Sequence, residues 1–155
     1  FDKYKNNPAK NGIIKINGNS HDSLFVSRLP NIIDANLTGD YWCSEYVQYS
    51  YIKIDFMQNL VRIDKYTLRV GDTVGDFFFT SWTLKGTTES NQEVILDDVN
   101  NSSQITKSHP EATVILQGKP FVRSIQITMK RNHNKVGSGD YAMVVRYFEI
   151  FGQIK

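Results

Sequence analysis

The segment Ser81-Trp82-Thr83-Leu84-Lys85-Gly86-Thr87 alternates apolar and polar residues, and a second apolar run follows at Val94-Ile95-Leu96 after a polar break. Alternation with a period of two is typical of a strand with one buried face, and turn-forming residues between two such runs predict a β-hairpin. Trp82 and Leu84 then share one face of the hairpin. Because a tryptophan side chain is large, that face requires a second apolar layer opposite it.

The rest of the chain is predicted to supply this layer as further short strands. No segment of eleven or more residues keeps a helical period, and Tyr41-Trp42-Cys43-Ser44 is expected to be an aromatic anchor outside regular structure. Short strands separated by turn signals favour an antiparallel sandwich or jelly roll. Besides the hairpin, the expected strands are 12–16, 24–26, 51–56, 61–63, 66–70, 112–116, 120–129 and 142–151, and 29–34 is expected to be an ordered loop.

Length and composition set the class of protein. A chain of 155 residues suits one domain, 1–155, and needs no metal or disulfide to fold. Its net charge of +2 is too small to indicate nucleic-acid binding. The single Cys43 excludes an internal disulfide, which favours an intracellular, reducing compartment. The chain begins at Phe1 without a signal peptide, so we expect a domain taken from a longer protein.

A family resemblance rests on the order and spacing of several motifs. They are Tyr41-Trp42-Cys43-Ser44, Tyr51-Ile52-Lys53-Ile54-Asp55-Phe56, Ser81-Trp82-Thr83-Leu84-Lys85-Gly86, Phe121-Val122-Arg123-Ser124-Ile125-Gln126-Ile127 and Tyr147-Phe148-Glu149-Ile150-Phe151-Gly152. Together they resemble the discoidin, or coagulation factor 5/8 type C, domain over most of the chain. The resemblance implies an all-β, eight-stranded antiparallel jelly-roll β-sandwich of the galactose-binding-domain-like class, in which loops at one end hold the ligand.

The sequence contains no motif for catalysis. The three histidines, His21, His109 and His133, lie in polar loop-like contexts, and none adjoins a nucleophile signature. The carboxylate pair Asp97-Asp98 is expected at a hairpin end, facing solvent. No His/Cys cluster indicates zinc and no glycine-rich loop indicates a nucleotide. We therefore predict a domain that is not an enzyme.

Three loops are candidates for ligand binding. The segment 71–80 carries three consecutive phenylalanines that cannot all point inward if it is extended, and its position matches a loop that lines the ligand end in the family. The segment 130–141 is rich in hydrogen-bond donors, and 19–22 could lie at the same end. If the three converge, they form a shallow polar cup with an aromatic wall. The alternatives are that Phe77 and Phe79 close the end of the sandwich and that 130–141 is a solvated connection. The candidate ligand-binding residues are His21, Asp22, Asp72, Phe77, Phe78, Phe79, Arg131, Asn132, His133 and Asn134.

The resemblance also implies a calcium site, although the domain requires no cofactor to fold. Carbohydrate-binding relatives hold a structural calcium with an acidic loop before the tryptophan and a glutamate near the C-terminus. Asp34, Asn36, Thr38 and Glu149 fall near those positions and carry the oxygen ligands that Ca²⁺ prefers. Ala35 replaces the usual glycine and Asn36 the usual second aspartate, which lowers the charge of the site. The alternative is that Asp34 organises its own loop.

Two functions of different classes follow from the resemblance. In the first, the domain is a ligand-recognition module that binds a glycan through the loops at one end. In the second, it is a protein-interaction domain within a larger intracellular protein of the BTB or ubiquitin-ligase type, with no sugar binding. Membrane-lipid binding through Phe77 to Phe79 ranks below both, because the near-neutral charge gives it no support.

Overall fold

The computed structural model describes residues 7–34, 39–72, 77–131 and 142–155, with the backbone alone for Arg131. In this part of the chain no helix is long and apolar enough to cross a membrane. The elements are β1 (Lys15–Gly18), α1 (Ser23–Arg28), the 3-10 helix η1 (Leu29–Ile33), β2 (Trp42–Cys43), β3 (Tyr51–Asp55), β4 (Val61–Val70), β5 (Ser81–Thr87), β6 (Glu93–Val99), β7 (Glu111–Ile115), β8 (Ser124–Arg131) and β9 (Val144–Ile154).

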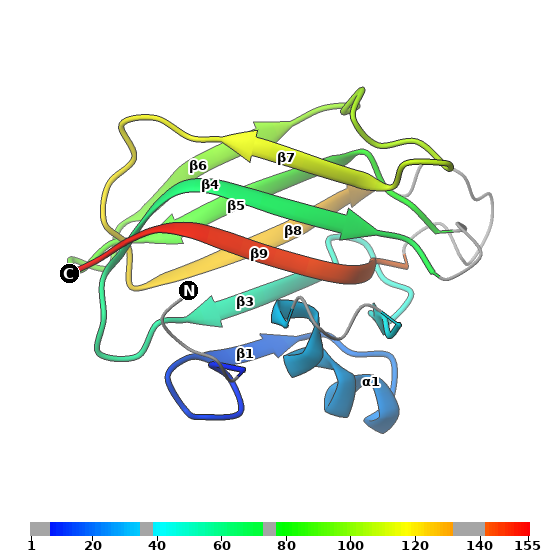
Figure 1. The fold of residues 1–155 in the computed structure, drawn as a ribbon, viewed down its shortest axis with the longest axis horizontal. Helices are drawn as coiled ribbons and strands as arrows, with labels where there is room; N and C mark the ends of the chain where they lie inside the picture. The colour runs from blue at the N-terminus through cyan, green and yellow to red at the C-terminus, as the bar shows by residue number, and fades with distance from the viewer. Residues whose placement is uncertain (1–6, 35–38, 73–76, 132–141) are drawn as a thin grey trace.

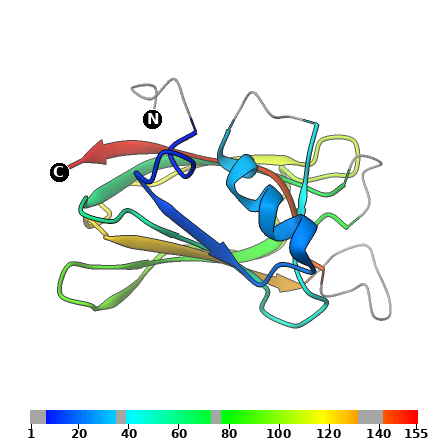
Figure 2. The same ribbon diagram turned by 90° about the horizontal axis from the view of Figure 1, so that it is seen from below.

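The strands form two antiparallel sheets that face each other (Figures 1 and 2). One sheet has the order β1-β3-β8-β5-β6 and the other the order β2-β9-β4-β7. In Figure 2 the two sheets appear as separate layers, with α1 and β1, the edge strand of the first sheet, nearest the viewer. The predicted jelly-roll sandwich is confirmed, with nine described strands where eight were expected, the shortest being the two-residue β2.

The hairpin predicted from the sequence is the pair β5 and β6. Trp82 and Leu84 are fully buried, as the alternation requires. The opposite layer comes from β4 and β9, where Tyr66 and Phe148 are buried with their ring centroids 6.0 Å apart in an edge-to-face arrangement. Two β-sheets that bury their apolar faces against each other in this way form the core of the domain.

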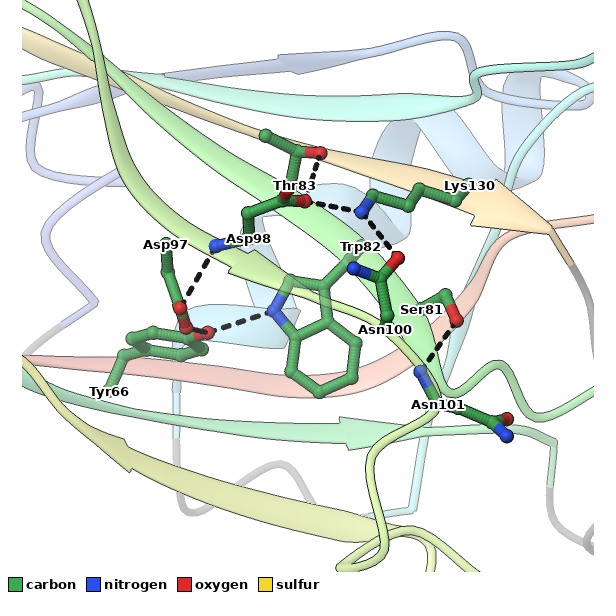
Figure 3. Close-up of polar contacts among 9 residues, drawn as sticks. All are labelled: Tyr66, Ser81, Trp82, Thr83, Asp97, Asp98, Asn100, Asn101 and Lys130. Atoms are coloured by element: carbon green, nitrogen blue, oxygen red, sulfur yellow. Dashed lines mark hydrogen bonds and ion pairs between the residues drawn. The ribbon is translucent and has the colours of Figure 1, made fainter.

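A register shift in the hairpin changes the expected position of one carboxylate. Between Leu84 and Lys85 the pairing moves from Asp97 to Ile95, so Leu96 is the extra residue of a β-bulge. Figure 3 shows the result: the carboxylate of Asp97 accepts a hydrogen bond from the hydroxyl of Tyr66, whereas Asp98 forms an ion pair with Lys130 on β8. The prediction that both carboxylates face solvent at a hairpin end was therefore wrong for Asp97.

Other sequence-based assignments also differ from the structure. Residues 24–26 belong to α1 and not to a strand, because Asp22 adopts an extended conformation and its Oδ1 accepts the N–H of Phe25 at 3.2 Å, which caps the helix. The segments 61–63 and 66–70 are one strand, β4, with a register shift against β9 between Ile63 and Lys65. The loop expected at 29–34 is the 3-10 helix η1, with Pro30 in its first turn.

At one end of the sandwich, called the loop end here, lie the strand ends that flank the three predicted ligand loops. Strands β1, β4 and β8 run toward this end and β3, β5 and β9 start from it, on the right-hand side of Figure 1. The chain leaves the sheets there after Gly18, Val70 and Arg131. The antiparallel topology thus brings segments that are far apart in sequence to one surface.

Candidate functional site

A cavity of about 190 Å³ lies at the loop end. It is lined by residues from the loop after β1, from α1, from the segments on either side of β2, from the loop after β4 and from the start of β9. Four of its lining residues were predicted from the sequence as ligand-binding residues. The lining consists of His21, Asp22, Phe25, Tyr41, Cys43, Tyr46, Asp72, Phe77, Ala142 and Val144.

Backbone hydrogen bonds between two loops hold His21 and Asp22 at the cavity. Ser20 and Ser44 form an isolated antiparallel bridge, and the N–H of His21 donates to the carbonyl of Cys43 at 3.0 Å. Asp22 then caps α1 with Oδ1 and accepts a 3.2 Å contact from His21 Nδ1 at Oδ2. The hydrogen bond to His21, with that to the Phe25 N–H, lowers the pKa of the Asp22 carboxyl, so this group stays ionised at neutral pH.

Aromatic rings form a continuous wall of the cavity. The ring of His21 lies 4.9 Å from that of Tyr46 and 6.2 Å from that of Phe25, and the Phe25 ring lies 5.8 Å from that of Tyr41, measured between centroids. The Arg28 guanidinium lies 5.6 Å from the centroid of Phe25 and 5.8 Å from that of Tyr41. Tyr46 is 48% exposed, so its ring remains accessible at the rim.

The floor of the cavity is a small apolar cluster of Cys43, Ala142 and Val144. It is fixed by the pairing of β2 with β9 and by hydrogen bonds between the Ser44 N–H and the Met143 carbonyl (3.0 Å) and between the Met143 N–H and Ser44 Oγ (2.9 Å). Burial raises the pKa of the Cys43 thiol to about 11. A reactive cysteine requires the opposite shift, so this thiol stays protonated and is not an activated nucleophile.

Asp72 and Phe77 come from the loop between β4 and β5. The N–H of Gly71 donates to the carbonyl of Val144 at 2.9 Å, which ties the beginning of this loop to β9 beside the cavity. Phe77 has a φ of 57°, in the left-handed region that costs energy for a residue with a bulky side chain. Such a conformation persists only where the surroundings enforce it, and here it accompanies an aromatic ring that lines the cavity.

The other predicted ligand-binding residues do not line the cavity. Phe78 and Phe79 are 8% and 0% exposed, and Phe79 packs edge-to-face on Trp82 with ring centroids 6.2 Å apart. Both therefore belong to the core, which corrects their assignment as ligand contacts. Of Arg131 only the backbone is described, paired with Ser81. Asn132, His133 and Asn134 lie outside the described residues, so their roles stay predictions.

Of the predicted calcium ligands, the two that the structure describes, Asp34 and Glu149, do not line this cavity. Asp34 ends η1, and Glu149 lies on β9 as a hydrogen-bond partner of the Tyr147 hydroxyl. Burial first, then the hydrogen bond to Glu149, and then the charges of Glu149, Glu111 and Asp34 raise the pKa of Tyr147, so both described candidates act on this hydroxyl together with Glu111. Asn36 and Thr38 lie outside the described residues, and within the described ones no three His, Cys, Asp or Glu side chains form a metal site. The calcium site stays a prediction.

Six lining residues were not predicted from the sequence as ligand contacts: Phe25, Tyr41, Cys43, Tyr46, Ala142 and Val144. The concentration of aromatic residues at 41–51 was a usable signal, because Tyr41, Tyr46 and Tyr49 are more than a single core anchor requires. For Phe25 there was no such signal once its segment had been interpreted as a strand.

Comparisons with known proteins find similarity to solved structures only. No family model matches the sequence, and no curated protein matches it. A module produced by Clostridium perfringens, CpGH89CBM32-6, has a TM-score of 0.67 at 11% identity and covers 96% of this chain and 100% of its own. Another from the same organism, in complex with GalNAc-beta-1,3-galactose, has a TM-score of 0.67 at 13% identity, covering 90% and 96%.

A third similar structure is the CBM32 of AlyQ in complex with 4,5-unsaturated mannuronic acid, with a TM-score of 0.64 at 16% identity, covering 90% of this chain and 95% of its own. At these identities the likeness concerns the fold. The domain has the two-sheet jelly-roll fold of these structures, which is the fold that its resemblance to discoidin domains implied.

Proposed function

We propose that this domain is a non-catalytic module that binds a glycan in the loop-end cavity. The observation that carries the proposal is the lining itself, in which aromatic rings and two carboxylates converge at one end of a rigid sandwich. A concave site with apolar walls and a few placed polar groups is the usual form of a small-molecule site. Sugars match it because a pyranose ring has an apolar face of C–H groups and an edge of hydroxyls.

The residues have separate roles in this proposal. The exposed ring of Tyr46 and the half-buried ring of Phe77 would pack on the apolar face of the sugar, while Asp22 and Asp72 would accept hydrogen bonds from its hydroxyls. Hydrogen bonds to ionised groups contribute about 1.5–3 kcal/mol each. Support also comes from the similar structures, several of which are described as complexes with sugars. The predicted residues Arg131 to Asn134 would add donors to the same site.

A glycan array with the purified domain tests the proposal, with calcium in one arm and a chelator in the other. We expect binding to one sugar class, and we expect Tyr46→Ala to abolish it. Tyr49→Ala is the matched control, because Tyr49 belongs to the same loop, is 67% exposed and does not line the cavity. A blank array from folded protein would overturn the proposal and favour a protein partner.

A further inference from the structure

Four of the rings that line the loop-end cavity form one series of contacts. The ring of Tyr46 pairs with that of His21, which pairs with that of Phe25. The ring of Phe25 in turn pairs with that of Tyr41. Hydrogen bonds fix the middle of the series, because the N–H of His21 donates to the carbonyl of Cys43 and Phe25 belongs to the capped helix α1. Tyr41 lies at the end of the series, directly before β2, so the position of its ring depends on other contacts.

Arg28 contacts both rings at this end of the series. It is the last residue of α1, three residues after Phe25, so the two side chains are neighbours on the helix surface. The guanidinium carbon lies 5.6 Å from the ring centroid of Phe25 and 5.8 Å from that of Tyr41. A planar guanidinium stacks on aromatic rings and is attracted by their faces. One side chain therefore joins a ring of α1 to a ring of the segment before β2.

Asp40 directs Arg28 toward this segment. Nη2 of Arg28 lies 4.0 Å from Oδ1 of Asp40, the residue before Tyr41. The two side chains are 28% and 48% exposed, so water screens the ion pair and its contribution to stability is small. Phe25 and Tyr41 line the cavity, whereas Arg28 and Asp40 do not. Any effect of Arg28 on a ligand therefore passes through the two rings.

The rings of Phe25 and Tyr41 form a corner of the cavity with a defined shape. Their centroids are 5.8 Å apart, their planes are tilted by 36°, and both residues are half-buried. A ring that is already held in one rotamer loses less conformational entropy when a ligand packs on it. A rigid corner also discriminates between sugars. An epimer with a hydroxyl where the preferred sugar has a C–H group would bury that hydroxyl without a hydrogen bond, which costs free energy.

We infer that Arg28 is a positioning residue of the glycan site, which holds the rings of Phe25 and Tyr41 at a fixed angle and so determines how well the cavity distinguishes one sugar class from others. This inference rests on the proposed function and adds the control of specificity by a residue outside the cavity. Loss of Arg28 should weaken binding and broaden it, because mobile rings fit more sugars and fit each of them less well.

The test uses the same glycan array, read at a series of protein concentrations so that each bound sugar gives an apparent dissociation constant. Arg28→Met removes the charge and keeps an apolar stem. We expect this variant to bind the preferred sugar class about fivefold to tenfold more weakly and other sugars with a smaller loss, so that selectivity falls. Arg28→Lys should restore part of the selectivity, because an ammonium group is also attracted by ring faces.

Arg62→Met is the matched control. The Arg62 guanidinium also lies over a ring, 5.6 Å from the centroid of Phe121, and it pairs with Asp64, but none of these three residues lines the cavity. This variant should bind the array as wild type does. If Arg28→Met altered affinity and selectivity no more than Arg62→Met does, the inference would be overturned.

A double-mutant cycle with Tyr41→Leu tests whether Arg28 acts through the ring. Leucine keeps apolar bulk at this position and removes the aromatic face. In the Tyr41→Leu background, Arg28→Met should weaken binding by only about twofold, since one of its two ring contacts is already lost. The melting temperature of each variant is measured, so that a change in affinity is assigned only to folded protein.

The outcomes separate this inference from the proposed function. Equal losses of affinity on Arg28→Met in both backgrounds would show that Arg28 acts independently of Tyr41, which would overturn the inference and leave glycan binding standing. A blank array for folded wild type would overturn both.

Discussion

The hydroxyl of Tyr66 on β4 donates a 2.5 Å hydrogen bond to Oδ2 of Asp97 on β6, and so joins the two sheets through the core (Figure 3). The same hydroxyl accepts the indole N–H of Trp82 at 2.8 Å. Tyr66 and Trp82 are both fully buried. Two of the largest polar side chains of the interior therefore satisfy one another, and the bulge at Leu96 makes this geometry available.

Tyr66→Phe should destabilise the domain. The substitution leaves the buried Trp82 N–H without its acceptor and Asp97 without its donor, which costs about 1–3 kcal/mol of unfolding free energy. Urea denaturation followed by tryptophan fluorescence measures the change. Tyr49→Phe is the control, because this residue is 67% exposed and should behave as wild type. Equal midpoints for Tyr66→Phe and wild type would contradict the structural role of the network.

Gly152→Ala should also destabilise the domain, although Gly152 is exposed. A Cβ at this position would lie 1.9 Å from the carbonyl oxygen of Arg62, on the backbone of the neighbouring strand β4. Because backbone atoms cannot move aside easily, we expect a loss of about 1–3 kcal/mol of unfolding free energy. Gly39→Ala has nothing within 4 Å of the new Cβ and serves as the control. Similar thermal midpoints for the two variants would contradict this account of the β4–β9 pairing.

The stability of the domain should fall as the pH rises from about 9 to 11, partly through Cys43. The pKa of its thiol is about 11 in the folded protein and 9.0 as a model value, so unfolding releases a proton in this range. The buried thiol therefore adds its full share to the unfolding free energy below about pH 9, and this share is lost as the pH approaches about 11. Denaturant titrations at several pH values should show a steeper decline for wild type than for Cys43→Ala. If the unfolding free energies of wild type and Cys43→Ala fell equally with pH, burial would not raise the pKa of this thiol.

The predicted donors of the 130–141 segment lead to a separate expectation. Changing Arg131 and His133 together to alanine should abolish glycan binding without lowering the melting temperature, because Arg131 is the last residue of β8 and His133 follows it in the predicted loop 130–141. Affinity is measured by titration with the sugar found on the array, and folding by thermal denaturation. Unchanged affinity would remove these residues from the site and leave the described lining residues to carry the binding.

The calcium prediction is tested by thermal denaturation with calcium and with chelator. If Asp34 and Glu149 hold the ion together with Asn36 and Thr38, calcium at a hundred times its dissociation constant adds about 2.7 kcal/mol of stability. Glu149→Gln should then remove the response while leaving the fold intact. A melting temperature indifferent to both additions would assign Asp34 and Glu149 to the support of Tyr147 instead.

Local sequence patterns were sufficient for the sandwich and its central hairpin. Strict alternation around Trp82 and Leu84 requires a strand with one buried face, and this physical requirement does not depend on which partner covers that face. The loop residues His21, Asp22 and Asp72 were also predictable as candidates, because polar residues after strands lie at sheet ends. The same reasoning failed for Asp97, since an alternation rule cannot predict a bulge.

By itself, the sequence determined that the chain folds as a two-layer β-sandwich with its variable loops at the strand ends. Only the tertiary structure decided which loops meet. The cavity joins Asp22, Tyr46, Phe77 and Val144 from segments that are distant in the chain, and pairing between β2 and β9 is what brings them together. The charged aromatic cavity thus depends on the order and direction of the strands, because no local sequence pattern predicts which loops lie at the same end of a sheet.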